Sequence, residues 1–334
     1  MTPLRSENTE GACSCARSFC PFCGRLLIRN MDVRHGYHSL CCEQLFGFTR
    51  APTLKLEGDW MECMHPFSES SYLISLRLDP RSMKLIPSLQ TTCRFFLKVP
   101  AIRNVSEANR QAENEWLTMS LARTFGIFAV QMQFVPIESG RIGLIVPRID
   151  REVGPHGIVQ HHVESLAQIG RQPKGFRSEQ QRTLLSSLDL QQGLTLLQAS
   201  DYPKQDAHAY ILRMLFSYVF SVPACSSRKL ILIQREDSTR RLGPALGLRL
   251  NIDGLDLFQK NARTSEERIH RYYPLAARLG LCRTDAERLL RFVLIREPSV
   301  MRLLQRFPMK KLGRHRMLLL DSAEKRYAVL KTLV

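Results

Sequence analysis

The sequence lacks any long hydrophobic run, and no stretch approaches the roughly 18 apolar residues that a membrane-spanning helix requires. Its first residues also lack the basic start and apolar stretch of a secretory signal peptide. Mean hydropathy is −0.18, and no internal repeat or low-complexity tract is present. We therefore expect a cytoplasmic protein without membrane association, in which 334 residues build more than one domain.

Acidic residues are scarce relative to basic ones. The chain has 31 Asp and Glu against 48 Lys and Arg, which gives a net charge of +17. Such a surplus favours polyanionic partners, namely nucleic acid, an acidic protein or phosphate groups. The alternative is that the arginines only cover solvated helix faces, since they are scattered and form no compact basic stripe in the sequence.

Cysteine is sparse after the first fifty residues and dense within them. Six of the ten cysteines lie between residues 13 and 42, and without a secretory signal such a cluster indicates a metal site rather than disulfides. Cys20 and Cys23 have C-x2-C spacing, and after 14 residues His38 and Cys41 follow at a similar spacing. This Cys3His set predicts a structural zinc site. The alternatives are buried free thiols, or exchange with nearby donors, which are Cys13, Cys15, His35 and Cys42.

The pattern of β-forming and helix-forming residues changes once along the chain. Between residues 51 and 150, strands are predicted at 72–78, 94–99, 131–137 and 141–146. One helix at 106–125 interrupts them, with Leu117, Leu121 and Phe125 at i, i+4 spacing and Gly126 at its end. Later segments predict helices at 158–169, 178–198, 206–220, 265–279, 284–296, 297–306 and 321–333. The sequence thus predicts an α+β fold.

Several short segments occur in an order typical of one family. The most informative are Phe96-Leu97-Lys98, Glu113-Asn114-Glu115 and Pro147-Arg148-Ile149-Asp150-Arg151. Together with segments at 37–47, 163–168, 248–252 and 276–280, they make nearly the whole chain resemble the HipA-like toxin kinases. The resemblance implies a bilobal protein-kinase-like fold, with a zinc module at 1–50, a β-rich N-lobe at 51–150 and a helical C-lobe at 151–334. It also implies ATP with Mg²⁺, serine phosphorylation of a translation-related target, and a DNA-binding antitoxin as partner.

The same resemblance assigns the nucleotide-binding residues. Lys98 matches the lysine that holds the α- and β-phosphates, and Glu115 or Glu113 matches the helix acid that orients this lysine. Residues Pro147, Arg148 and Ile149 match the hinge beside the adenine, where backbone groups bind. The alternative for Lys98 is an ordinary lysine at the end of a strand.

The resemblance fails where the catalytic acids should follow. The family carries G-x-x-D-x-H-x-K-N after an apolar helix, whereas here the helix at 213–220 is followed by Ser-Val-Pro-Ala-Cys-Ser-Ser-Arg-Lys. Ala224 takes the proton-acceptor position, Lys229 a metal-ligand position and Gly247 that of the second metal acid. Loss of a general base alone costs about 10²–10⁴ in rate, and the phosphate loop at 63–68 is also eroded. These changes predict a catalytically impaired or inactive kinase, a pseudokinase.

Three functions follow from these features. The first is a HipA-like pseudokinase that acts by binding a partner, either an antitoxin-like repressor or nucleic acid. The second is an active Ser/Thr kinase that uses displaced acids, with Asp206 or Asp237 as candidates, although Asp206 precedes the apolar helix and is more simply explained as a cap of its own helix. The third is a nucleic-acid-binding protein built on the zinc module.

Overall fold

A computed structural model describes residues 33–34, 37–40, 53–54, 64–68, 71–79, 81, 84–88, 93–136, 141–154, 157–169, 188–222, 224–250, 269–306 and 313–334. The chain divides into two units, Met1–Ala51 and Pro52–Val334. In the first unit, strands β1 (Val33–Arg34) and β2 (Tyr37–His38) form an antiparallel pair. All other described helices and long strands belong to the second unit.

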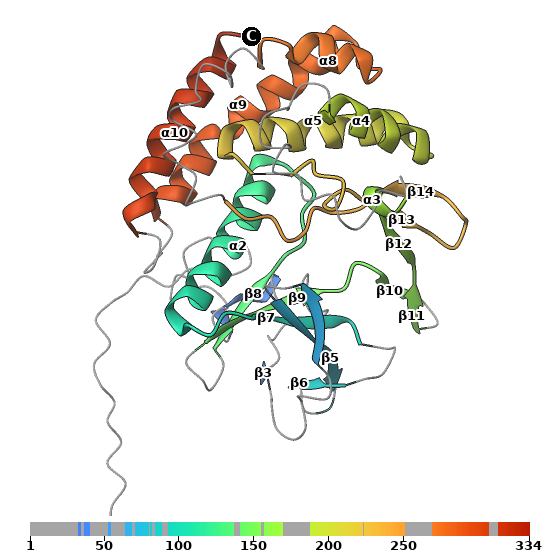
Figure 1. The fold of residues 1–334 in the computed structure, drawn as a ribbon, viewed down its shortest axis with the longest axis vertical. Helices are drawn as coiled ribbons and strands as arrows, with labels where there is room; N and C mark the ends of the chain where they lie inside the picture. The colour runs from blue at the N-terminus through green and yellow to red at the C-terminus, as the bar shows by residue number, and fades with distance from the viewer. Residues whose placement is uncertain are drawn as a thin grey trace, which may run out of the picture. The chain divides into compact units, whose positions relative to one another are not determined.

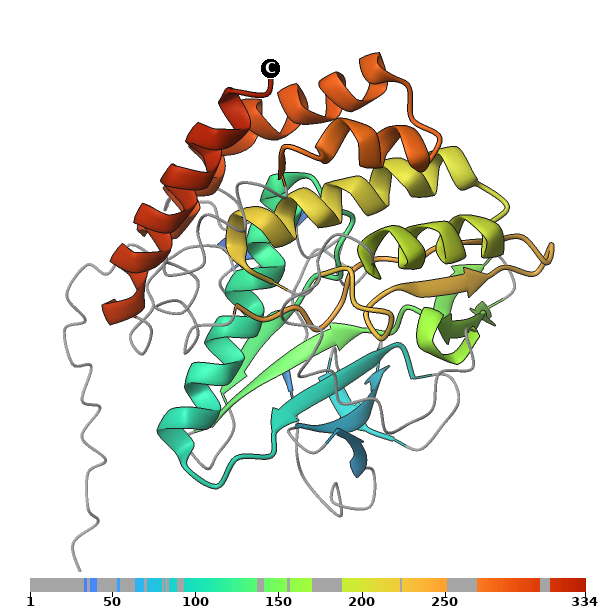
Figure 2. The same cartoon turned by 45° about the horizontal axis from the view of Figure 1, so that its top comes forward.

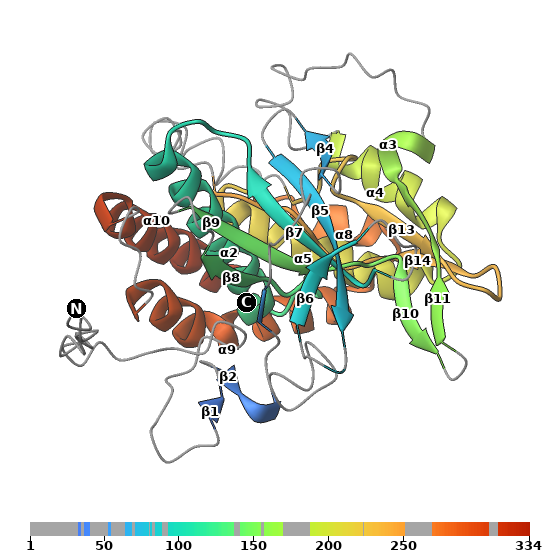
Figure 3. The same cartoon turned by 90° about the horizontal axis from the view of Figure 1, so that it is seen from below.

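The second unit begins with a seven-stranded sheet of order β3-β6-β5-β7-β9-β8, in which β4 pairs with β5 (Figure 3). The strands are β3 (Thr53–Leu54), β4 (Met64–Ser68), β5 (Ser71–Asp79), β6 (Lys84–Pro87), β7 (Phe95–Pro100), β8 (Gln133–Pro136) and β9 (Ile142–Pro147). They confirm the strands predicted from the sequence. In β7, Phe95 and Leu97 are buried on one face, as the period of two requires. The register places Lys98 of this central strand between Leu73 and Leu144.

Helix α2 (Val105–Phe125) packs against the sheet at strands β7 and β9 (Figure 1). It begins at Asn104, whose side chain accepts a hydrogen bond from the Glu107 amide at 3.1 Å, a standard N-cap. It ends at Gly126, which has a left-handed φ of 108° and packs so closely on Phe292 that a Cβ would overlap the ring. The predicted apolar stripe is confirmed, because its leucines and phenylalanine are all fully buried.

Helices make up most of the rest of the second unit (Figure 2). They are α3 (Leu166–Ile169), α4 (Leu188–Ala199), α5 (Pro203–Phe220), α8 (Tyr272–Arg278), α9 (Arg283–Arg306) and α10 (Gly313–Lys331). An aromatic cluster joins two of them to α2: Phe125 of α2 packs on Phe216 and Phe220 of α5 and on Tyr327 of α10. Because these rings are nearly inaccessible to solvent, they hold α2 firmly under the helical part.

Two predictions about the helical region are wrong. The helix predicted at 158–169 is restricted to α3, and the preceding residues form β11 (Gly157–Gln160), paired with β10 (Arg151–Gly154), and β12 (His162–Ser165). Strand β12 pairs with β13 (Ile231–Gln234), which pairs with β14 (Arg240–Leu242). The helices predicted at 284–296 and 297–306 are one helix, α9. It continues through Pro298 because Val293, Val300 and Leu304 on either side are fully buried.

Candidate functional site

Lys98 and Glu115 form a buried ion pair between the sheet and α2. The Lys98 ammonium donates to both carboxylate oxygens, at 2.6 Å to Oε1 and 2.7 Å to Oε2. The two residues are 6% and 1% exposed, so this is a desolvated, charge-assisted contact. Burial lowers the pKa of Lys98, and the Glu115 carboxylate opposes that shift. The sequence left the choice between Glu113 and Glu115 open, and the structure places Glu115 on the lysine.

Lys229 and Gly247, the residues at the two metal-ligand positions, contact each other beside this pair. The Lys229 ammonium donates to the Gly247 carbonyl at 2.6 Å. Gly247 has a left-handed φ of 61°, and a Cβ there would lie 2.8 Å from Lys229 Nζ and 3.9 Å from Glu115 Oε1. A side chain at position 247 would therefore displace the ammonium. The structure thus brings both positions identified in the sequence to the Lys98–Glu115 pair.

Arg249 adds a third cation to the cluster. Its Nε lies 3.4 Å from Glu115 Oε2, so one carboxylate faces three basic side chains. Burial first, and then the charges of Lys98 and Arg249, lower the pKa of Lys229 to about 8, although the Glu115 carboxylate opposes this shift. Lys98 and Glu115 are thus buried together, and Lys229 lies close enough to both for their charges to shift its pKa.

A second set of contacts fixes the segment that carries Gly247 and Arg249. The Asn114 side chain on α2 accepts from the Leu250 amide and donates to the Leu250 carbonyl, both at 2.9 Å. Thr118 Oγ1 accepts from the same amide at 3.0 Å. Sequence reasoning did not assign a role to Asn114 or Arg249. Their only signal was their position next to Glu115 and Gly247, because the contacts span 136 residues of sequence.

The residue at the proton-acceptor position cannot act as a base. Ala224 is fully buried in the turn after α5, where its amide donates to the Val222 carbonyl at 2.7 Å and to Ser217 Oγ at 3.2 Å. Its methyl group offers no lone pair for a substrate proton. Position 224 therefore contributes packing and backbone geometry only.

Asp206 and Asp237, the two acids considered as replacements for the missing catalytic residues, make their hydrogen bonds with residues outside the Lys98 cluster. Asp206 is buried in the first turn of α5, and its Oδ2 accepts from Ser200 Oγ at 2.6 Å and from the Leu242 amide at 2.7 Å. The contact with Leu242 links α5 to β14. The expectation that Asp206 caps its own helix is therefore wrong, because its carboxylate binds the backbone of a distant strand instead. Asp237 lies in the exposed turn between β13 and β14, where hydrogen bonds from Thr239 lower the pKa of its carboxyl group.

The segment predicted as a hinge directly follows β9. Arg148 is anchored by its amide, which donates to the Arg94 carbonyl at 2.8 Å. Its guanidinium lies over the Phe96 ring at 4.6 Å and binds Asp150 at 2.7 and 3.0 Å. Burial alone would raise the pKa of Asp150, but Arg148 and Arg151 outweigh it and hold that pKa below its usual value. These side-chain contacts fix the segment, in which Pro147 is the last residue of β9 and Ile149 is half-buried; its role as a hinge stays a prediction.

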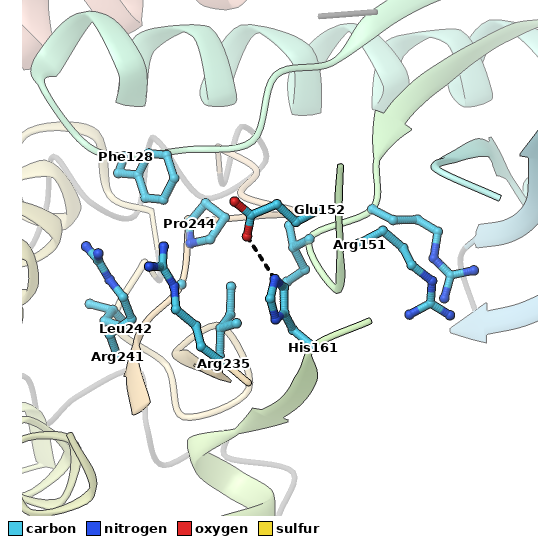
Figure 4. A pocket seen from close by; sticks show the side chains of 12 residues that line it. Phe128, Arg151, Glu152, His161, Arg235, Arg241, Leu242 and Pro244 are labelled. Atoms are coloured by element: carbon cyan, nitrogen blue, oxygen red, sulfur yellow. Dashed lines mark hydrogen bonds and ion pairs between the residues drawn. The ribbon is translucent and has the colours of Figure 1, made fainter. Parts of the chain in front are cut away.

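A basic pocket of about 390 Å³ lies beside this segment, which contributes Arg148, Ile149 and Arg151 to its lining (Figure 4). The lining side chains include Phe128, which is 68% exposed, and Arg235 and Arg241, which rise towards it. His161 Nε2 lies 2.9 Å from Glu152 Oε2 at one wall. Arg148 and Ile149 of the predicted hinge line this pocket. The cluster residues, which are Lys98, Glu115, Lys229, Gly247 and Arg249, do not.

The predicted zinc site falls mostly outside the described residues. His38 lies on β2 and is half-buried, whereas Cys20, Cys23 and Cys41 are not among the residues that the structure describes. Within the described ranges, no group of three or more His, Cys, Asp or Glu side chains is arranged to hold a metal ion. The Cys3His zinc site stays a prediction.

The Mg²⁺ that accompanies ATP in kinases does not fit the described residues of the Lys98 cluster. A hard divalent cation needs oxygen ligands, but positions 229 and 247 supply an ammonium and a carbonyl that this ammonium already occupies. The remaining carboxylate, Glu115, is held by Lys98 and Arg249. We therefore derive no step that passes through a bound metal.

A curled antiparallel sheet, a helix whose glutamate pairs with a strand lysine, and a largely helical second half define a protein-kinase-like fold. Residues 77–223 match the HipA-like C-terminal domain, and the match ends one residue before Ala224. Residues 77–223 are therefore similar to the HipA-like C-terminal domain, which confirms over this segment the resemblance inferred from the sequence.

The structure is similar to that of HipA from Shewanella oneidensis MR-1, determined in a toxin–antitoxin complex with HipB and its operator DNA. The TM-score is 0.53 at 13% identity, over 83% of this chain and 67% of that chain. The proinflammatory kinase CtkA of Helicobacter pylori matches with a TM-score of 0.47 at 9% identity, over 77% of this chain and 95% of that chain. A search of curated proteins found no match. None of the described helices is long and apolar enough to cross a membrane.

Proposed function

We propose that this protein is a HipA-like pseudokinase that has lost phosphoryl transfer and acts by binding a partner. The observation that carries the proposal is the contact between Lys229 and Gly247. Phosphoryl transfer needs metal-binding acids and a residue that positions the nucleophile, and these positions hold a lysine, a glycine and the buried Ala224. The retained Lys98–Glu115 pair supports descent from a working kinase.

The partner that this proposal favours is a DNA-binding antitoxin-like protein. The similar HipA structure holds HipB and operator DNA, and the net charge of +17 suits an assembly on a polyanion. Direct binding of nucleic acid by the chain itself is the competing explanation of that charge. The two are separable, because direct binding has a steep dependence on salt concentration.

Activity is tested by incubating the purified protein with labelled ATP and Mg²⁺ or Mn²⁺, and by measuring phosphate incorporated into the protein and into an added protein acceptor. We expect no incorporation above that of the Lys98→Ala variant. Incorporation by the wild type that this variant abolishes would reject the proposal in favour of a kinase using displaced acids. Asp206→Asn and Asp237→Asn would then identify the acid.

Partner binding is tested on duplex DNA. We expect the protein alone to bind DNA weakly at physiological salt, and to join a DNA complex only when an antitoxin-like DNA-binding protein is added. Tight binding by the protein alone, weakening steeply between low and high salt, would assign nucleic-acid binding to the chain itself.

A further inference from the structure

The pocket beside the predicted hinge combines positive charge with apolar surface, and its volume of about 390 Å³ suits a ligand larger than a single small ion. Of the described residues that line it, four are arginines and one is an acid. The acid is Glu152, which lies 2.9 Å from His161 Nε2. Two of the arginines, Arg148 and Arg151, donate to Asp150 at 2.7 Å. The other two arginines of the lining are therefore the cations that a ligand can meet.

Arg235 and Arg241 are placed together by the hairpin of β13 and β14. Arg241 pairs with Ile233 across the hairpin, and Arg235 follows Ile233 by two residues, so the period of two puts all three on one face. This face lines the pocket, and both arginine side chains point towards Phe128 (Figure 4). Two positive charges on one face repel each other, and an anion bound between them would relieve that repulsion.

Neither of these guanidiniums forms an ion pair with a carboxylate in the part of the chain that the structure describes. Arg241 lies over the Tyr202 ring at 6.0 Å, and Arg235 acts on Asp237 of the adjoining turn through its charge. Both arginines are exposed. Because a guanidinium presents its N–H donors in a planar fork that matches a carboxylate, this pair is suited to one or two carboxylates of a ligand.

The apolar side of the pocket indicates a ligand with an apolar group next to its charge. Phe128 lines the pocket and is nevertheless 68% exposed, and Pro244 and Ile149 contribute further apolar surface to the lining. Val153, which follows Glu152 on β10, is also largely exposed. Aromatic and arginine side chains are enriched where proteins bind one another. Packing of a partner's apolar side chain on Phe128 would remove this surface from water.

We propose that this pocket binds an acidic segment of a partner protein, in which one or two carboxylates meet Arg235 and Arg241 and a neighbouring aromatic or aliphatic side chain packs on Phe128. The inference rests on the proposed function in one respect, namely that the protein acts by binding a partner. It goes further in naming the surface and the chemistry of the bound segment. A protein segment fits better than nucleic acid, because two available arginines are few for a repeating phosphate backbone and the lining offers apolar contacts.

Selection from a displayed library of random short peptides against the full-length protein tests the proposal. We expect the enriched peptides to carry Asp or Glu next to an aromatic or aliphatic residue. The same selection against the double variant Arg235→Ala with Arg241→Ala should not enrich them. No enrichment, enrichment of peptides without acidic residues, or enrichment of the same peptides by the double variant would overturn the proposal.

Fluorescence polarisation of the most enriched peptide, carrying a label, assigns its binding to the pocket. Arg235→Ala with Arg241→Ala should weaken binding by roughly 10- to 100-fold, the range for hydrogen bonds to a charged group, and Phe128→Ala by roughly 10-fold. These side chains are exposed, so the variants should keep the fold. The matched control is Arg291→Ala with Arg302→Ala, which removes the same charge from exposed positions on α9 and should leave the affinity unchanged. An equal loss in the control would show binding through net charge alone and contradict the proposal.

Two comparisons separate this inference from its alternatives. We expect a short single-stranded oligonucleotide not to displace the peptide. Displacement by an oligonucleotide whose own binding is lost in the double variant and kept in the control would assign the pocket to nucleic acid and overturn the proposal. Phosphate incorporation by a protein that binds the peptide in this pocket would refute the proposed function alone, whereas the absence of both peptide binding and incorporation would refute this inference alone.

Discussion

Replacement of Lys229 with methionine tests whether the buried ammonium costs folding stability. In the folded protein the pKa of Lys229 is lowered from 10.5 to about 8, chiefly by burial and then by the charge of Lys98. The unfolded chain therefore binds more protons between pH 8 and 10.5, and the free energy of unfolding should rise with pH in this window. Below pH 8 both states hold the proton, and the cost is fully present.

The size of this cost follows from the shift. At 1.36 kcal/mol per pKa unit, a protonated Lys229 lowers the free energy of unfolding at pH 7 by about 3 kcal/mol. At pH 9.5 about 2 kcal/mol of that cost has been relieved, because the folded state has released the proton. Methionine keeps the apolar part of the side chain without the charge. It also loses the hydrogen bond to Gly247, which lowers the free energy of unfolding of the variant by about 1 kcal/mol. We therefore expect Lys229→Met to be more stable than the wild type at pH 7 by about 2 kcal/mol.

Urea unfolding at pH 7 and pH 9.5, followed by far-ultraviolet circular dichroism, measures this difference. The advantage of Lys229→Met over the wild type should shrink by about 2 kcal/mol between the two pH values. Burial raises the pKa values of Tyr272 and Tyr327. Their contribution to the pH dependence is the same in both proteins, so it cancels when the stability of the wild type is subtracted from that of Lys229→Met. Lys325→Met, at an exposed site, should show no such change with pH. An equal difference at both pH values would refute the reasoning.

Four further outcomes are expected. Glu115→Gln leaves three cations without their carboxylate and should lower the free energy of unfolding by about 3–5 kcal/mol; wild-type-like stability in urea would contradict the ion-pair cluster. Gly247→Ala and Gly280→Ala should each lower the free energy of unfolding by about 1–2 kcal/mol, because both positions have a left-handed backbone. An added Cβ meets open space at Gly280 but Lys229 Nζ at Gly247, so Gly247→Ala should unfold at a lower urea concentration than Gly280→Ala. Asp206→Asn should cost about 1–3 kcal/mol through its contacts with Ser200 and Leu242, and equal stability would reopen a catalytic role. Metal analysis should find about one zinc per chain, lowered by Cys20→Ser; less than about half an equivalent, unchanged by that variant, would reject the zinc site.

Local sequence patterns predicted the elements that depend on neighbouring residues. The i, i+4 spacing of Leu117, Leu121 and Phe125 predicted the buried face of α2, and runs of β-forming residues predicted the central strands β5 and β7. The order of Lys98, Lys229 and Gly247 along the chain was enough to identify the family positions that they occupy. These features are readable because helix and strand periods span only a few residues.

Pairings between distant segments could not be read in the same way. Strand β12 was predicted as helix because its partner, β13, follows only after more than sixty residues. Asp206 was interpreted as a helix cap, but its carboxylate accepts a hydrogen bond from the Leu242 amide, 36 residues away. In both cases a long-range partner outweighed the local preference.

The sequence by itself predicted the HipA-like resemblance, the pairing of Lys98 with Glu115 or Glu113, and Lys229 and Gly247 at the positions where the family carries metal ligands. Tertiary structure decided what those residues do to one another: that Lys98 binds Glu115, that Arg249 joins them, and that the Lys229 ammonium binds the Gly247 carbonyl. The reason is physical. Substitution of a single residue is visible in the chain, but the charge balance of a cleft exists only when the folded protein removes water and brings its cations together.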